Sequence, residues 1–325
     1  MRHFLLEFIT GGGLAGQALS ESLIREGELM IRTLLNELIE AGFSDISLTR
    51  DKRFKLSDHT ASQHIINESL EEKLHECINE SDIAWLIAPE TNDCLGKLAE
   101  VFITNGKVFI GSSPDAIRIA ASKLQTSSLL QEAGVDVVET KNINDEPPAS
   151  QTGWVIKPDD GVGGESCFFI KDKSRLIEII ADKKCNNFVV QPFINGRHLS
   201  MSLLVFDEKV QLLACNVLYV AIENEVVRLS TIGVNECLYL KKEMMVLALK
   251  IIAEIEGFSG YIGVDMIEAN NKLFVLEINP RFTTTYVGLS ESLGINMTKK
   301  ILDTFLMGKL PEIDLAAAVP VRIKI

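Results

Sequence analysis

Basic residues are scarce relative to acidic ones in this chain of 325 residues. Lys and Arg number 32 against 45 Asp and Glu, which gives a formal net charge of −13. A nucleic-acid-binding protein needs a basic face, and docking on an anionic membrane needs a basic patch. The acids are spread along the chain, so we expect neither nucleic acid nor membrane as a partner. Long apolar runs are also missing, since no segment is long enough to span a bilayer.

The sequence lacks any C-x-x-C pair. Its six cysteines are scattered, at Cys77, Cys94, Cys167, Cys185, Cys215 and Cys237. This spacing is typical neither of a zinc site nor of a dense disulfide framework, so we expect reduced thiols in a cytoplasmic protein. The first residues, Met1–Ile9, hold a short apolar run interrupted by Glu7, and we expect a first strand there rather than a signal peptide.

Histidines with metal-ligand spacing are missing as well. Surface or loop positions are expected for all five, which are His3, His59, His64, His75 and His198.

Two familiar phosphate-binding fingerprints are absent. Gly11-Gly12-Gly13 follows the first strand, but the residues after it do not complete a Rossmann fingerprint. A loop that backs onto a substrate and a simple turn are equally compatible with it. The stretch Asp159–Ser166 is no Walker loop, because no Gly-Lys-Ser/Thr follows, and Ser166 stands where a dinucleotide fingerprint needs its third glycine. These gaps weigh against an NAD-dependent oxidoreductase.

Strand and helix signals alternate in the first third of the chain. The expected strands are Phe4–Ile9, Asp45–Thr49, Ile83–Ala88 and Val108–Gly111, and the expected helices are Leu23–Ile39, Glu68–Asn79 and Leu95–Asn105. Such a βαβ series predicts a parallel sheet with helices on both faces. The length of the chain exceeds one ordinary core, so two or three domains are expected.

The middle of the chain predicts two further helices and then a small α+β unit. Ser113-Pro114-Asp115 starts a helix with Pro after a Ser cap, and Ser122–Ala133 forms a second one. The α+β unit has strands at Trp154–Lys157, Cys167–Ile170 and Phe188–Pro192 and a helix at Ser174–Lys183. The remainder mixes strands (Ser200–Phe206, Gln211–Ala221, Val319–Ile325) with helices (Lys242–Glu256, Asn296–Met307). The fold class is therefore α/β combined with α+β.

The most informative motif lies near the C-terminus. Asp265, the pair Asn270-Asn271 and then Glu277-Ile278-Asn279 predict two adjacent strands joined by a tight turn. Period-2 alternation places Glu277 and Asn279 on one face, and Asp265 can oppose them across the hairpin. Three oxygen ligands at one spot suit Mg²⁺, and Arg281, two residues on, suits phosphate. The pattern predicts a site that holds a nucleoside triphosphate through a metal.

Three upstream motifs are ambiguous by themselves. Lys157 ends a strand before the glycine-rich turn Asp159–Ser166, whose backbone N–H groups can wrap an anion, although a plain hairpin turn is equally compatible. Gln191–Gly196 could read an adenine edge, although an edge strand entering a turn explains it as well. Lys123 begins a helix, where lysines are commonly solvated. Because a cation at this position opposes the helix dipole, its presence is a weak hint of an anionic partner.

The order of these motifs resembles the ATP-grasp superfamily over nearly the whole chain. The ordered set is Lys123, Lys157, the glycine loop, Gln191–Gly196, Asp265 and Glu277–Arg281. The resemblance implies an ATP-grasp fold with an N-terminal Rossmann-like domain, a small lid domain and a C-terminal domain, with ATP between the last two. The corresponding ranges are 1–115, then 116–193 for the linker helices and lid, then 194–325.

The same resemblance implies roles for individual residues at the phosphates. Lys123 and Lys157 would contact the α- and β-phosphates, and the mobile loop over the triphosphate would contain Gly161, Gly163 and Gly164. Lys157 would be catalytic together with Arg281, which would stabilise phosphoryl oxygens in the transition state.

Further roles concern the base and the metal. Gln191 would bind the adenine amino group, with the backbone at Pro192 and Ile194 completing the hinge. Two Mg²⁺ ions, or Mn²⁺ in their place, would be held by Asp265, Glu277 and Asn279. Many members carry a Glu for the ribose two residues after the hinge glycine. Here His198 stands there, which leaves the ribose contact unassigned.

A narrower likeness is to the tyramine–glutamate ligase branch, which serves methanofuran biosynthesis in archaea and some methylotrophic bacteria. It rests on Phe8–Gly13, Ser22–Gly27, Ala88–Thr91, Gly111–Pro114 and Asn279–Leu289. The likeness implies an ATP-dependent carboxylate–amine ligase that activates a carboxylate as an acyl phosphate and forms an amide. The γ-carboxylate of L-glutamate and an aromatic amine are the implied substrates.

Three alternatives stay open at this point. A ligase of the same superfamily could use another amino acid or peptide, with Arg25, Glu90 and Thr283–Thr285 as candidate substrate contacts. An NAD-dependent oxidoreductase or a non-catalytic nucleotide-binding protein would belong to other classes. Small-molecule acid and amine partners are expected, and a homodimer is compatible with the sequence.

Overall fold

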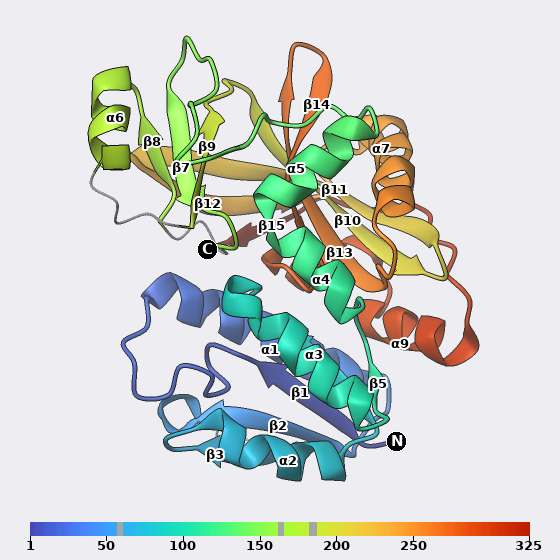
Figure 1. Ribbon diagram of the computed structural model, residues 1–325. Helices are drawn as coiled ribbons and strands as arrows, with labels where there is room; N and C mark the ends of the chain where they lie inside the picture. The colour runs from blue at the N-terminus through green and yellow to red at the C-terminus, as the bar shows by residue number, and fades with distance from the viewer. Residues whose placement is uncertain (57–60, 162–165, 182–186) are drawn as a thin grey trace.

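The structure is a computed structural model, and it describes residues 1–56, 61–161, 166–181 and 187–325. Two sheets organise these residues. A five-stranded parallel sheet occupies the N-terminal part, and a ten-stranded sheet contains most of the strands that follow (Figure 1). Together they give the mixed α/β and α+β architecture that the sequence predicts.

The N-terminal sheet has helices on both faces, as predicted. Its order is β3-β2-β1-β4-β5, with β1 (His3–Glu7), β2 (Ile46–Asp51), β3 (Ser62–Ile66), β4 (Ile83–Ile87) and β5 (Val108–Phe109). Side chains alternate between two cores, because successive residues of a strand face opposite sides. Leu5 packs with α1 (Glu21–Glu40), whereas Phe4 and Leu6 pack with α2 (Leu70–Glu80) and α3 (Cys94–Thr104).

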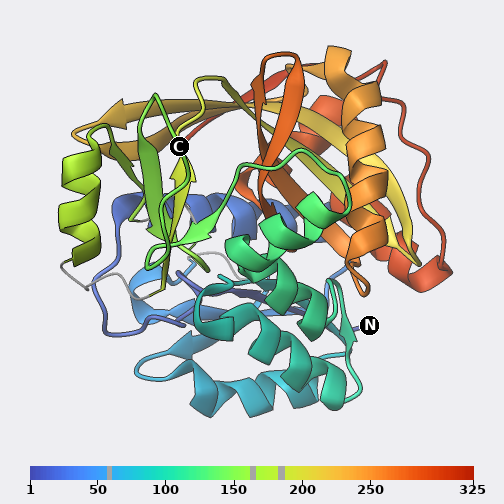
Figure 2. The ribbon, with the colours of Figure 1, turned by 45° about the horizontal axis from the view of Figure 1, so that its top comes forward.

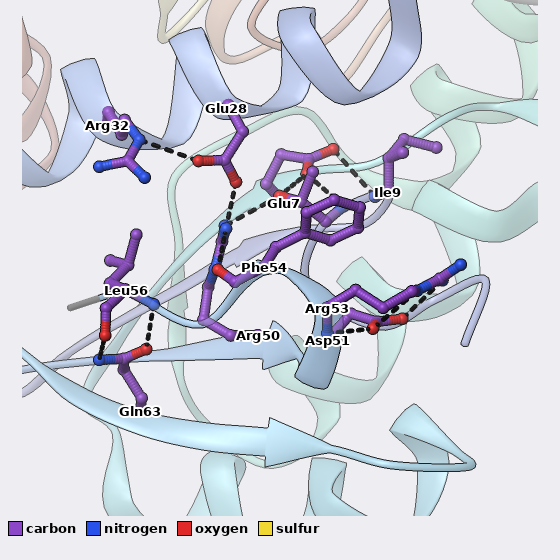
Figure 3. Close-up of polar contacts among 11 residues, drawn as sticks. Glu7, Ile9, Glu28, Arg32, Arg50, Asp51, Arg53, Phe54, Leu56 and Gln63 are labelled. Atoms are coloured by element: carbon purple, nitrogen blue, oxygen red, sulfur yellow. Dashed lines mark hydrogen bonds and ion pairs between the residues drawn. The ribbon is translucent and has the colours of Figure 1, made fainter. Parts of the chain in front are cut away.

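A buried polar cluster fixes the turn that follows β1 (Figure 3). The carboxylate of Glu7 accepts hydrogen bonds from the backbone N–H groups of Ile9, at 2.9 Å, and Thr10, at 2.7 Å. Fully buried Arg50 on β2 donates to the Thr10 hydroxyl at 2.9 Å and pairs with Glu28 of α1. Burial raises the pKa of the Glu7 carboxyl, while the hydrogen bonds from Thr10 and Ile9 oppose that rise. The cluster therefore joins β1, β2 and α1.

The large sheet contains the predicted C-terminal strands in the order β14-β13-β10-β11-β12-β8-β7-β9-β6, with β15 paired to β12. Its long strands are β10 (Arg197–Phe206), β11 (Lys209–Glu223), β12 (Val226–Val234), β13 (Gly260–Ala269) and β14 (Lys272–Asn279), and β15 is Val321–Lys324. Helix α7 (Lys241–Glu254) buries one apolar face against this sheet, including Met244, Leu247 and Ile251. Helix α9 (Met297–Met307), preceded by the short α8 (Leu289–Leu293), packs on α1 and β10.

One hydrophobic core joins the N-terminal sheet to the large sheet. Trp85 of β4 and Phe282, just after β14, belong to the same cluster, with ring centroids 6.2 Å apart. Tyr261 of β13 stacks on Phe282 from the other side, at 5.4 Å. The two parts of the chain are therefore packed together through apolar side chains, which fixes their relative position.

The predicted small α+β unit is present, and we call it the lid unit. It comprises β6 (Lys141–Asn142), β7 (Trp154–Pro158), β8 (Phe168–Ile170), α6 (Lys173–Ala181) and β9 (Phe188–Pro192). It has a core of its own, which includes Trp154, Ile156 and Leu176. Within the described residues, one pair, Val226 with Phe168, connects it to the remainder of the large sheet. Figure 2 shows the lid unit and the β13–β14 hairpin on the same side of the N-terminal sheet.

Two helices lead from the N-terminal sheet to the lid unit, as the sequence predicts. The hydroxyl of Ser113 caps α4 (Pro114–Ala121), and that of Ser122 caps α5 (Lys123–Glu132) by accepting from the backbone N–H of Gln125 at 3.1 Å. Both caps are the short polar side chains that satisfy free N–H groups at helix starts.

The expectation for the histidines was wrong for His3 and does not describe His64. His3 is buried on β1, where its Nδ1 accepts from the indole N–H of Trp85 at 3.2 Å. His64 lies on β3, with ring nitrogens 3.8 Å from Glu76 and 3.6 Å from Glu80. His59 lies outside the described residues. Among the helices that the structure describes, none has the length and apolar character to traverse a membrane.

Candidate active site

The hairpin at the centre of the predicted metal site is present. Asp265 on β13 is the register partner of Glu277 on β14, and the ladder is irregular directly after Asp265. Asn270 and Asn271 form the turn, with φ of 51° and 59°. Positive φ at both central residues is the requirement of a type I′ hairpin turn, which Asn meets well. The side chain of Asn279 donates to Asp265 at 3.3 Å, so all three predicted metal ligands lie together.

The two carboxyl groups of this hairpin have opposite pKa shifts. Burial and the adjacent Glu277 carboxylate raise the pKa of Asp265 to about 7. Burial also acts to raise the pKa of Glu277, but Lys157 and Lys123 outweigh it and lower that pKa to about 2. Hard oxygen ligands on two neighbouring acids fit a divalent cation such as Mg²⁺, which would relieve their mutual repulsion.

Two lysines, one buried and one largely buried, converge on a single oxygen of Glu277. The ammonium of Lys157, at the end of β7, lies 3.1 Å from Glu277 Oε2, and that of Lys123, at the start of α5, lies 3.6 Å from it. Lys123 is 5% exposed, so the ordinary expectation of a solvated lysine at a helix start does not hold for it. Burial lowers the pKa of Lys123. For Lys157 burial also acts downward, but Glu277 makes the net pKa shift upward. The charges come from separate segments, and the fold alone brings them together.

The start of the glycine-rich turn holds Lys123 in place. The Lys123 ammonium donates to the carbonyl oxygens of Asp159, at 3.0 Å, and Gly161, at 2.8 Å. The Asp159 carboxylate in turn accepts from the backbone N–H of Leu124 at 2.8 Å, which caps α5. Gly163 and Gly164 lie outside the described residues, so the predicted closing loop is described here only at Gly161.

Arg281 follows the hairpin and is already engaged by protein groups. Its Nε donates to Glu90 Oε2 at 2.9 Å, and one Nη donates to Asn279 at 3.3 Å. Glu90 comes from the loop after β4 and is buried. The sequence named Glu90 only as a candidate substrate contact, and its pairing with Arg281 was missed. The two residues are 191 positions apart, and the position of Glu90 after a buried strand was the available signal.

The predicted adenine hinge lies at the end of β9. Gln191 is buried and its side-chain amide donates to the Thr140 hydroxyl at 2.9 Å. Pro192 ends the strand, and Ile194 follows it in the chain. β9 pairs with both β6 and β7, so it is no edge strand. On β10, burial and the nearby Lys157 lower the pKa of His198, which favours its neutral form. The nucleotide contacts of these residues stay predictions.

A narrow cavity lies where the N-terminal sheet, the lid unit and the hairpin meet. Its polar lining comes from Glu90, Lys123, Asp160, Gly161, Glu277 and Asn279. A larger hollow of about 650 Å³ surrounds Trp154 of the lid unit, but none of the predicted site residues lines it. The charged side chains therefore favour the narrow cavity as the functional site. The larger hollow has the greater volume but no predicted site residue in its lining.

Comparison with protein families identifies the family to which this chain belongs. Residues 120–285 match the ATP-grasp domain, more than half of the chain, and residues 44–117 match the pre ATP-grasp 3 domain. The chain belongs to the ATP-grasp family. It is an ATP-dependent C–N ligase, and the family uses ATP with a divalent metal, typically Mg²⁺.

Relatives with established names support this class. The tyramine–L-glutamate ligase of Methanocaldococcus fervens is 31% identical over 276 residues, which cover 83% of this chain and 84% of the relative. That of Methanocaldococcus jannaschii is 29% identical over 274 residues, with 83% and 80% covered. A tetrahydromethanopterin:α-L-glutamate ligase of the latter organism is 29% identical over 211 residues, with 59% and 68% covered.

Solved structures confirm the fold. An ATP-grasp superfamily protein from Archaeoglobus fulgidus matches with a TM-score of 0.72 and 23% identity, over 96% of this chain and 90% of that one. The biotin carboxylase of Campylobacter jejuni, solved with an ATP analogue, matches with a TM-score of 0.72 and 14% identity, over 96% and 72%. The ATP-grasp fold predicted from the sequence is therefore correct.

Proposed function

We propose that this ATP-grasp ligase joins the γ-carboxylate of L-glutamate to tyramine or a related aromatic amine, in methanofuran biosynthesis. The names of the two relatives described first support this substrate pair. The likeness of segments such as Ala88–Thr91 and Asn279–Leu289 to that branch supports it as well.

The observation that carries the proposal is the meeting of opposite charges from three parts of the chain. Lys123 and Lys157 approach Glu277 from α5 and the lid unit, while Arg281 is anchored to Glu90 of the N-terminal part. Three cations beside a pair of acids are suited to a triphosphate that carries a metal. Such an arrangement stabilises charge on phosphoryl oxygens without reorganisation.

In the first step, an oxygen of the substrate carboxylate attacks the γ-phosphorus of ATP. The bond from that phosphorus to the β-bridging oxygen breaks, which gives an acyl phosphate and ADP. We propose that Asp265, Glu277 and Asn279 hold two Mg²⁺ ions, or Mn²⁺, which supply charge neutralisation when bound. Lys157 and Arg281 would then bind phosphoryl oxygens, and their catalytic role is positioning and electrostatic.

In the second step, the neutral amine nitrogen attacks the acyl carbon, inorganic phosphate leaves, and the nitrogen loses its one surplus proton to the departing phosphate. The acyl phosphate must be shielded from water during this step. The lid unit would supply that shield, with Gly161, Gly163 and Gly164 in its closing loop. The proposed domain limits are 1–115, 116–193 and 194–325. The first part would contact the substrates, the second would cover the triphosphate, and the third would hold the metal.

The adenine base would bind at the end of β9. Gln191 would contact the amino group, and the backbone at Pro192 and Ile194 would complete the hinge. Lys123 would contact the phosphates from the opposite side. The buried, partnered state of Gln191 supports a fixed hinge, since its amide is held by Thr140.

The decisive experiment measures ADP release across a panel of acids and amines. We expect ADP formation that requires both glutamate and an aromatic amine, with the amide detected by mass spectrometry. The panel includes the other acid and amine pairs known for ATP-grasp ligases, tetrahydromethanopterin with glutamate among them. Turnover that ignores glutamate and tyramine but responds to another pair would assign a different ATP-grasp ligase activity.

A further inference from the structure

Glu90 has a carboxylate oxygen that the activity described so far does not use. The side chain is 4% exposed, and Oε2 accepts from Arg281 at 2.9 Å. The other oxygen, Oε1, is buried and has no hydrogen-bond partner among the described residues. A buried carboxylate oxygen without a partner is costly, which points to a ligand that pairs with it.

The loop that carries Glu90 is held in place. The next residue, Thr91, donates through its hydroxyl to the carbonyl of Asp160 in the lid unit's turn, at 2.9 Å. The backbone N–H of Asn92 donates to the Asp160 carboxylate at 2.9 Å. Asn92 and Asp93 both have positive φ, 56° and 58°, the left-handed conformation that Asn and Asp adopt more readily than other non-glycine residues. These contacts fix the position of Glu90 relative to the turn that follows β7.

Elimination among the acids that line the narrow cavity leaves Glu90. The two oxygens of Asp160 accept from Asn92 and from the side chain of Asn187, at 2.9 Å and 2.8 Å. Glu277 pairs with both lysines and is a proposed metal ligand. Glu90 is therefore the lining acid with a fully buried oxygen that has no hydrogen-bond partner among the described residues.

The available oxygen suits a cation, and the proposed substrates bring two ammonium groups at neutral pH, that of the aromatic amine and the α-ammonium of L-glutamate. The phosphates and the two carboxylates of glutamate match the lysines and Arg281. Loss of a contact to the α-ammonium of glutamate would reduce hydroxamate and amide formation together, so the trapping assay described below separates the two occupants. We propose that Glu90 binds the ammonium group of the amine substrate, accepts one of its protons, and orients the resulting neutral nitrogen toward the acyl phosphate. This assignment rests on the proposed function and adds an amine subsite contributed by the N-terminal part of the chain.

A purely structural role is the competing explanation, since Glu90 could serve only to position Arg281. The two roles separate in a trapping assay. Hydroxylamine is uncharged at neutral pH and captures an acyl phosphate as a hydroxamate, so it needs no ammonium subsite. If a substitution of Glu90 acts through Arg281, the rates of hydroxamate and amide formation fall together. If it removes an ammonium subsite, only amide formation with the amine substrate is impaired.

The test compares Glu90→Gln with the wild type in both assays. Gln retains a carbonyl oxygen that can accept from Arg281 but lacks the charge. We expect the KM for tyramine to rise about 10- to 100-fold, because a hydrogen bond to a charged group is lost. Hydroxamate formation from glutamate should fall far less. As a matched control, Glu100→Gln removes an exposed acid that pairs with Arg118 outside the cavity, and it should leave the KM for tyramine unchanged.

Equal losses of hydroxamate and amide, or an unchanged KM for tyramine, would overturn the assignment. If Glu90→Gln does not fold, the wild type provides the answer through inhibition. The N,N-dimethylated amine should then bind about 10- to 100-fold more tightly than the alcohol in which a hydroxyl replaces the amino group. Equal inhibition by the two analogues would contradict an ammonium subsite. Failure of the wild type to form any hydroxamate from glutamate would instead overturn the proposed function.

Discussion

Glu277 is the acid toward which the two lysines point, and it illustrates how much depends on single residues here. Its partners lie 3.1 Å and 3.6 Å away and belong to different segments. In the structure it neutralises Lys157 and Lys123, and in the proposed complex it holds metal. Both roles require a negative charge, and its lowered pKa maintains that charge at neutral pH.

Replacing Glu277 with Gln should lower the rate of ADP formation by at least about 10²-fold, because a ligand of the proposed metal is lost. The amide keeps the side chain's size and one acceptor oxygen, so the protein should remain folded by circular dichroism. Glu243→Gln, an exposed acid on α7, is the control and should retain full activity. ADP release by Glu277→Gln at the wild-type rate would refute the metal assignment.

At the residue scale, the sequence predicted what short-range pattern encodes. Glu277 and Asn279 alternate on one strand, and Asp265 precedes a turn that folds back on it. The burial of Lys123 and the partner of Glu90 depend on contacts across the whole fold, so local pattern gives only hints of them. For Lys123 the hint was its position against the helix dipole, and the structure explains it by the nearby Glu277.

Among the elements, the β13–β14 hairpin has the strictest geometry. A shift of its register by one residue would turn every side chain of one strand to the other face. Asp265 would then no longer oppose Glu277. The turn at Asn270 and Asn271, with both φ values positive, holds the register in place.

Replacing Asn271 with Val should destabilise the protein by about 1–2 kcal/mol, because a branched side chain disfavours the left-handed region. ADP formation should fall as well, since the hairpin that carries the proposed metal ligands loses its preferred turn. Urea unfolding and the ADP assay measure the two effects. Asn271→Gly is the control, because glycine accepts this conformation. Equal stability of the Val and Gly variants would contradict this role of the turn.

Most elements were predictable because their signals are local. Ile83–Ile87 is a continuous buried run, and Ser113-Pro114 and Ser122 mark helix starts by their chemistry. The strands β3, β6 and β12 were missed, as was the short helix α8. The first half of β12 alternates partly buried and exposed positions, with Arg228 and Ser230 exposed, so its pattern is weak without its neighbours β11 and β15.

At the scale of the whole molecule, three parts meet around one cavity. The N-terminal part contributes Glu90, the turn of the lid unit contributes Asp160 and Gly161, and the hairpin contributes Glu277 and Asn279. A ligand bound there contacts all three parts at once and should stabilise them together.

A saturating addition of ATP with Mg²⁺ should therefore stabilise the protein against unfolding. At a ligand concentration 100 times the Kd, the expected gain is about 2.7 kcal/mol. Thermal unfolding measures this shift, and ATP without Mg²⁺ should give less. NAD serves as the control ligand and should have no effect. Stabilisation by NAD and not by ATP with Mg²⁺ would favour an oxidoreductase and contradict the ligase.

The order of the motifs was sufficient to predict the ATP-grasp fold. The packing of the N-terminal sheet against the large sheet could not be predicted. It depends on apolar residues such as Trp85 and Phe282, and apolar residues of this kind occur in every hydrophobic core. The sequence therefore indicates which parts are present, and tertiary packing determines how they face one another.

The large sheet curves back on itself, with a consequence for how the enzyme works. Lys157 on β7 and Glu277 on β14 are separated in the sheet by β13, β10, β11, β12 and β8, yet their charged atoms lie 3.1 Å apart. Any movement of the lid unit away from the hairpin would break this ion pair. A triphosphate offers Lys157 a substitute partner, so binding of the nucleotide would lower the free-energy cost of such a movement.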